Sequence, residues 1–118
     1  IMCTMGRFRS ILLVKFKPDV AEEECVRLLE EQAKAKCVMI KSIEIECGMD
    51  IITPEKLRHG FTHILMVTFN TNNDFIGHRS DPKNAKFPPA LSAIIEDILM
   101  FNYQSIPIIP PLPLPIAA

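Results

Sequence analysis

Two short apolar runs constrain the fold of this chain most strongly. Arg9 to Lys17 reads R-S-I-L-L-V-K-F-K and stops at Pro18, and Thr62 to Phe69 is a second run of the same kind. Runs of this length, rich in branched side chains and bounded by turn residues, are typical of buried strands rather than of three-turn helices. We therefore expect two strands that are apolar on both faces, in a sheet whose two faces must both be covered.

The segment between these runs changes its hydrophobic period twice. Asp19 and Glu22 form a candidate capping box, and a helix to about Lys36 is expected because apolar residues then recur at helical spacing: Ala21, Cys25, Leu28, Leu29 and Ala33. From Ile40 onward Ile43, Ile45 and Cys47 alternate with polar residues, which predicts a strand that Gly48 ends. Thr53-Pro54-Glu55 and Gly60 then bound a short helical turn.

The second half of the chain predicts two helices and a last strand. Thr71 can cap a short helix that stops before Asp81-Pro82. A second helix is expected from about Phe87 to Asp97, with Pro88 and Pro89 in its first turn and four residues facing the core: Ala90, Leu91, Ile94 and Ile95. Ile98 to Tyr103 completes the elements as a strand.

This order predicts an α+β, ferredoxin-like βαββαβ domain with a four-stranded antiparallel sheet. Helices cover one face, and the other face is apolar enough to require a partner, so we expect a homodimer that closes into a dimeric α/β barrel. We place the domain at residues 9–105, after an N-terminal extension at residues 1–8. Residues 106–118 hold five prolines and predict an extended, polyproline-like tail.

Composition argues against several classes of function. Thirteen Lys and Arg are balanced by fourteen Asp and Glu, without a basic stripe interleaved with aromatic residues, so we expect no nucleic-acid partner. The longest apolar stretch is broken by prolines and too short for a membrane span. Four cysteines are scattered without a C-x-x-C pair, Cys3, Cys25, Cys37 and Cys47, and we expect no secretory signal because the first residues lack a continuous apolar segment. We therefore expect reduced thiols in a cytoplasmic protein with neither a metal nor a cofactor.

Five blocks of this sequence resemble the plant stress-responsive A/B barrel, or Dabb, domain. They run in order across about residues 9 to 104: L-V-K-F-K (13–17), I-K-S-I-E (40–44), G-F-T-H (60–63), V-T-F (67–69) and I-L-M-F-N-Y (98–103). The resemblance implies a homodimeric barrel, heat-stable in several plant members, with a pocket between the sheet and the helices of each subunit.

One branch of that family is similar in sequence and acts as a cofactor-free polyketide (olivetolic acid) cyclase. Its H-P-x-H segment corresponds here to Asp81 through Asn84, which puts Asn84 at the position of the catalytic base. His78 stands at the position of the assisting Tyr, Ser10 at that of a strand-one His, and His63 is the G-F-T-H histidine. Asn cannot accept a proton near neutral pH, so this chain departs from the cyclase pattern. We therefore expect a relocated acid–base dyad of His78 and His63 as the catalytic residues, with Asn84 as a hydrogen-bond donor.

Two functions follow from these residues. The first is a stress-responsive dimeric barrel that binds an apolar small molecule without turning it over, which the missing H-P-x-H histidine favours. The alternative is a cofactor-free, polyketide cyclase-like enzyme of plant specialised metabolism, catalysing an aldol-type cyclisation or an isomerisation. The ionisable side chain at position 78 favours this alternative, although a lone histidine is also common on helix surfaces.

Overall fold

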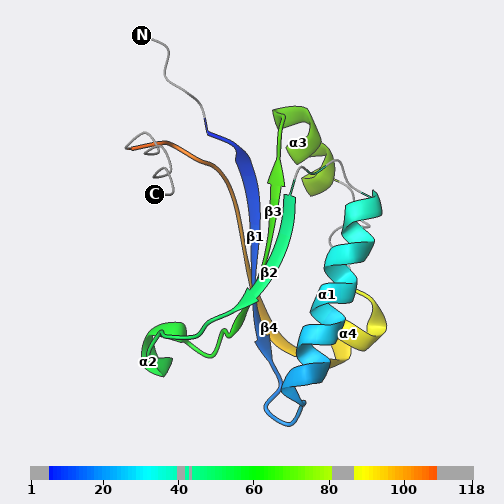
Figure 1. Ribbon diagram of the computed structural model, residues 1–118, viewed down its shortest axis with the longest axis vertical. Helices are drawn as coiled ribbons and strands as arrows, with labels where there is room; N and C mark the ends of the chain where they lie inside the picture. Colours follow the sequence, from blue (N-terminus) through cyan, green and yellow to red (C-terminus); the bar gives the residue numbers. More distant parts are fainter. Residues whose placement is uncertain (1–5, 40–41, 43, 81–86, 109–118) are drawn as a thin grey trace, which may run out of the picture.

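The computed structural model describes residues 6–39, 42, 44–80 and 87–108 (Figure 1). It contains one four-stranded antiparallel sheet with the strand order β2-β3-β1-β4. The elements, in chain order, are β1 (Phe8–Phe16), α1 (Glu22–Met39), β2 (Glu44–Met49), α2 (Glu55–Arg58), β3 (His63–Phe69), α3 (Asn72–Ser80), α4 (Pro89–Ile94) and β4 (Ile95–Gln104). The fold is ferredoxin-like and α+β, as the order of sequence patterns predicts.

The two apolar runs form the centre of the sheet. β1 pairs with β3 from Phe8 opposite Phe69 to Val14 opposite His63, and on its other side with β4. Residues directly opposite each other share a face of the sheet, so the register assigns each side chain to one of two faces. One face, which includes Leu12, Val14 and Leu65, is buried in the core.

Helices α1, α3 and α4 lie on that core face, whereas α2 lies on the opposite side of the sheet (Figure 1). One core cluster gathers Leu12, Val14, Leu29 of α1 and Leu65, while a second gathers Val67, Phe69 and Phe75 of α3. Cys25, Leu28 and Leu29 are buried on α1, as their helical spacing predicts, but Ala21 is exposed. We call the face without these three helices the open face.

The helix before the last strand is shorter than predicted, and this prediction was wrong. α4 spans only Pro89–Ile94, and β4 begins at Ile95 instead of Ile98. Ile95 pairs with Phe16 and Asp97 with Lys15, across a shift of register between these two β1 residues. Ladder hydrogen bonds to β1 therefore outweigh the helical spacing of the last residues, and Ala90, expected in the core, is exposed.

Two other predicted boundaries also moved. β2 continues through Gly48 to Met49, because these residues pair with Ile64 and His63 of β3. α1 begins at Glu22, where the Ala21 carbonyl accepts the first helical hydrogen bonds, rather than at a cap made by Asp19. Ile43 and the tail beyond Ile108 lie outside the described residues.

Candidate ligand-binding site

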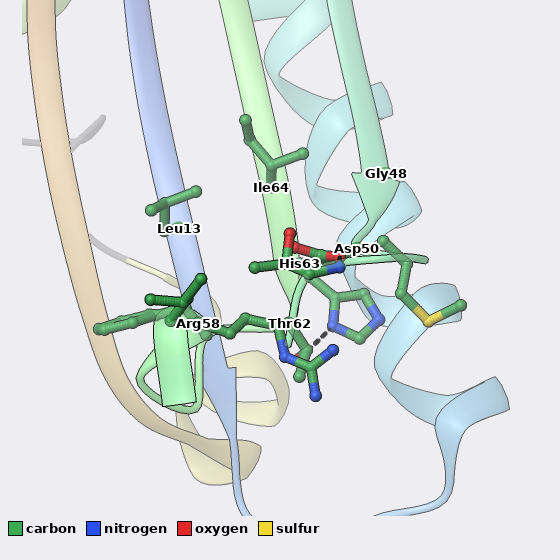
Figure 2. Close-up of a pocket in the computed structure, with 11 residues that line it drawn as sticks. Leu13, Gly48, Asp50, Arg58, Thr62, His63 and Ile64 are labelled. Carbon is green, nitrogen blue, oxygen red and sulfur yellow. Dashed lines mark hydrogen bonds between the residues drawn. The ribbon is translucent and has the colours of Figure 1, made fainter. Parts of the chain in front are cut away.

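A cavity of about 380 Å³ lies on the α2 side of the sheet, at the end where β2 stops and β3 begins (Figure 2). Its walls come from β1, from the β2–α2 loop, from α2 and from the start of β3. The lining residues are Leu13, Gly48, Met49, Asp50, Thr53, Leu57, Arg58, Phe61, Thr62, His63 and Ile64. Most of the wall is apolar, and a few polar side chains converge on it, which is the usual make-up of a small-molecule site.

Backbone hydrogen bonds hold the segments around this cavity together. The Asp50 N–H donates to the Thr62 carbonyl at 2.9 Å, and the Thr62 N–H donates to the Val14 carbonyl at 3.0 Å. α2 then ends in a left-handed turn, with φ of 54° at His59 and 85° at Gly60. This turn reverses the chain between Arg58 and Phe61, so that both side chains line one cavity.

Asp50 closes the loop between β2 and α2. Its Oδ1 accepts hydrogen bonds from the backbone N–H groups of Ile52, at 3.0 Å, and Thr53, at 2.8 Å. The hydrogen bonds from the Thr53 side chain and backbone, and then the charge of Arg58, lower the pKa of Asp50 below its ordinary range. Asp50 is therefore a carboxylate in this loop, engaged in its own turn.

A chain of hydrogen bonds leads away from the cavity through His63. Thr62 Oγ1 lies 2.6 Å from His63 Nδ1, and His63 Nε2 lies 2.9 Å from Glu22 Oε1 on α1 (the first contact is dashed in Figure 2). The carboxylate accepts, so in neutral His63 the Nε2–H donates to Glu22 and Nδ1 accepts from the Thr62 hydroxyl. Phe16 packs edge-on against the imidazole at 4.9 Å. His63 is thus a buried, oriented histidine with a hydroxyl on one side and a carboxylate on the other.

Arg58 is the only Lys or Arg among the described residues that line the cavity. Figure 2 shows its side chain extending from α2 toward Thr62 and His63. The Arg58 Nε is buried and has no hydrogen-bond partner among the described residues. The sequence patterns do not single out Arg58, because the short helix around it reads only as a connection between two strands. Its position directly before the His-Gly turn is the one sequence signal that points to it.

His78 lies far from this cavity. It is 9% exposed on α3 and packs against Phe69 with a ring separation of 5.0 Å, beside Phe75. Phe69 and His63 are the two ends of β3, about 20 Å apart along an extended strand. The structure therefore does not bring His78 and His63 together, and the expected dyad within one subunit is not formed.

Two predicted site positions remain, Ser10 and Asn84. Ser10 is buried and pairs with Val67, so it lies at the His78 end of the sheet. Asn84 lies outside the described residues. His59 is exposed, and the described residues contain no group of three or more His, Cys, Asp or Glu that could hold a metal ion.

A smaller cavity of about 150 Å³ lies on the helix side, between α1 and the end of β2. Its lining includes Leu29, Cys47 and His63. The sequence resemblance implies a pocket here, between the sheet and the helices. The larger cavity, however, lies on the α2 side of the sheet. Burial, reinforced by the charges of Glu30 and Glu46, raises the pKa of the Cys47 thiol, which favours its packing role over that of a nucleophile.

No helix within the described ranges is both long and apolar enough to cross a membrane. The element order and a four-stranded antiparallel sheet with helices α1, α3 and α4 on one face define the ferredoxin-like class of small α+β domains. Within that class, the family model described as "Stress responsive A/B Barrel Domain" matches residues 8–105. The chain belongs to this family.

One curated relative agrees with the family, and two solved structures agree with the fold. A stress-response A/B barrel domain-containing protein of Arabidopsis thaliana, At5g22580, is 31% identical over 102 residues, which cover 86% of this chain and 88% of the relative. The hydroxynitrile lyase of Passiflora edulis superposes with a TM-score of 0.67 at 20% identity, over 89% of this chain and 98% of that one. A dimeric ferredoxin-like protein of unknown function from Bacteroides fragilis gives 0.60 at 21% identity, over 85% and 97% of the two chains.

Proposed function

We propose that this protein is a homodimeric α/β barrel that binds a small apolar molecule as part of a stress response. The observation that carries the proposal is the apolar open face of the sheet. The register of β1, β3 and β4 places these apolar side chains on it: Ile11, Leu13, Ile64, Met66, Leu99, Phe101 and Tyr103. The charged residues Arg9, Lys15 and Asp97 share this face. Leu99 and Phe101 remain 45% and 59% exposed in one subunit, which is costly for large apolar side chains in water.

The α2 region supports the same arrangement. α2 and its loop lie on the open side of the sheet (Figure 1). Ile51 and Ile52 are 82% and 87% exposed, and Leu57 is 63% exposed. A second copy seated on the open face would reach these side chains as well.

Two relatives support the other parts of the proposal. The Bacteroides neighbour is described as dimeric, and the Arabidopsis relative is named a stress-response protein, which supports a role in stress. Location in the cytoplasm is part of the proposal.

Sedimentation velocity of the chain and of two matched variants tests the dimer. Phe101→Glu puts a charge on the open face, whereas Met100→Glu puts it on the same strand and at a similar exposure, 50%, but on the other face. We expect a dimer at micromolar concentration for the native chain and for Met100→Glu, and a monomer for Phe101→Glu. A native chain that is monomeric at that concentration contradicts the proposal.

A second candidate function is a cofactor-free cyclase or isomerase that acts by proton transfer. The specific observation in its favour is the Thr62–His63–Glu22 chain, because an imidazole oriented by a carboxylate is the usual form of a general base. A proton taken from a substrate carbon in the cavity would pass by way of Thr62 to His63, while Arg58 would face the enolate oxygen. One structural neighbour is named a hydroxynitrile lyase.

Turnover of a linear polyketide-like thioester separates the two functions. Under the enzymatic alternative, His63→Gln lowers turnover by at least tenfold while the dimer persists. Under the binding function, the native chain shows no turnover above buffer, and His78→Ala leaves ligand affinity unchanged. Circular dichroism of each variant checks that the fold is retained, since both histidines are buried.

A further inference from the structure

Arg58, the cation that lines the larger cavity, indicates which chemical class of ligand the cavity binds. This inference rests on the proposed ligand-binding function and names the class of molecule. The Arg58 guanidinium is a cation that offers hydrogen-bond donors and no acceptor. Its Nε is nevertheless buried without a hydrogen-bond partner among the described residues. A buried donor without an acceptor is unfavourable, so an acceptor that entered the cavity would gain free energy by meeting it.

The neighbouring acid does not serve as this acceptor. Asp50 lines the same cavity and interacts with Arg58 through its charge. However, the Asp50 Oδ1 is held by the N–H groups of Ile52 and Thr53, within its own turn. Lys15, the nearest cation on the open face of β1, pairs with Glu96 at 3.7 Å. One guanidinium therefore remains for a ligand, which favours a single negative charge over two or more.

The apolar residues that line the cavity determine which kind of ligand body fits beside the charged group. Leu13 and Ile64 contribute from the open face of the sheet, Leu57 from α2 and Phe61 from the turn behind it. A volume of about 380 Å³ falls in the range of small-molecule sites. The planar fork of an Arg side chain matches a carboxylate in two parallel hydrogen bonds. We infer that the cavity binds a small monocarboxylate with an apolar body, its carboxylate on the Arg58 guanidinium and its body between α2 and the sheet.

Cinnamate and the isosteric neutral cinnamamide are suitable probes, and isothermal titration calorimetry measures their affinities. We expect the native chain to bind cinnamate at least tenfold more tightly than cinnamamide. Arg58→Gln should weaken cinnamate by at least tenfold and leave cinnamamide within a factor of about two, since the apolar walls stay intact. Arg58→Lys, which keeps the charge but loses the fork, should fall between them.

Arg27→Gln is the matched control, because it removes one positive charge from the exposed face of α1, where Arg27 pairs with Glu24 and Glu31. It should leave both affinities unchanged. Methyl NMR locates the ligand: the signals of Leu13, Leu57 and Ile64 should shift on titration, and that of buried Leu28 should not.

Equal binding of cinnamate and cinnamamide, or an Arg58→Gln variant that binds cinnamate normally, overturns the inference but leaves a ligand-binding dimer in place. Failure of both probes to bind also overturns it. The dimer is judged separately, by the sedimentation of Phe101→Glu, so the two failures are distinguishable. Binding that shifts the methyl signals of the helix side instead would assign the site to the smaller cavity and contradict the role of Arg58.

Discussion

At the scale of single residues, Lys36 is a charge in an unfavourable place. It is 8% exposed on α1, and burial lowers its pKa below the ordinary value of 10.5. The unfolded chain therefore binds more protons than the folded chain in the alkaline range below 10.5, so this residue makes the fold more stable as pH rises through that range.

The prediction compares Lys36→Met with the native chain by urea unfolding. The variant lacks the alkaline rise, so its unfolding free energy relative to the native chain should decrease between about pH 7 and about pH 10. Lys34→Met, at an exposed position two residues away on the same helix, should show no such trend. A difference for Lys36→Met that stays constant with pH contradicts the argument.

His63 permits a second test at this scale. Its Nε2 faces the Glu22 carboxylate and its Nδ1 faces the Thr62 hydroxyl, so the neutral ring should carry its proton on Nε2. The nitrogen chemical shifts of the ring report this tautomer directly. Glu22→Ala removes the acceptor and should increase the population of the other tautomer. A native ring with its proton mainly on Nδ1 is incompatible with the hydrogen-bond chain described here.

Among the elements, α2 depends most on its last turn. His59 has a φ of 54°, a left-handed conformation that costs a side chain roughly 1 kcal/mol, and Gly60 has a φ of 85°. His59→Gly should therefore raise the unfolding free energy, by up to about 1 kcal/mol, because Gly adopts this conformation without strain.

Gly60→Ala should act in the opposite direction, by about 1–2 kcal/mol. A Cβ there would lie 2.6 Å from Lys15 Cε, and although that flexible chain can move, the backbone strain remains. Urea unfolding measures both variants. A neutral Gly60→Ala would mean that α2 is held by its packing rather than by this turn.

Nearby residues were sufficient to predict the ends of the helices that begin or stop at a capping or turn residue. Thr53-Pro54 and Gly60 bound α2, and the Thr71 hydroxyl accepts from the Asp74 N–H at the start of α3, as its position predicts. The boundary at Ile95 could not be predicted in this way, because pairing with Phe16, distant in sequence, decides it. The cavity was missed for the same reason: it arises only when α2 folds over the open face.

The whole molecule has one covered face and one open face. Helices α1, α3 and α4 bury the core face, but on the open face Phe101 and Leu99 stay largely exposed. A domain of this size buries only a modest core, so burial between two copies would supply a substantial part of its stability. The larger cavity shares Leu13 and Ile64 with the open face, so a partner seated there would also change access to the ligand.

A dimer that contributes to folding makes the melting temperature depend on concentration, since association stabilises the folded state by mass action. We expect the native chain to melt at higher temperature as its concentration is raised a hundredfold, and Phe101→Glu to melt lower and at one temperature throughout. Met100→Glu should follow the native chain, because its side chain is on the other face. Scanning calorimetry gives all three series. If the native melting temperature did not change, the open face would contribute nothing to stability, and the apolar side chains along β4 would need another explanation.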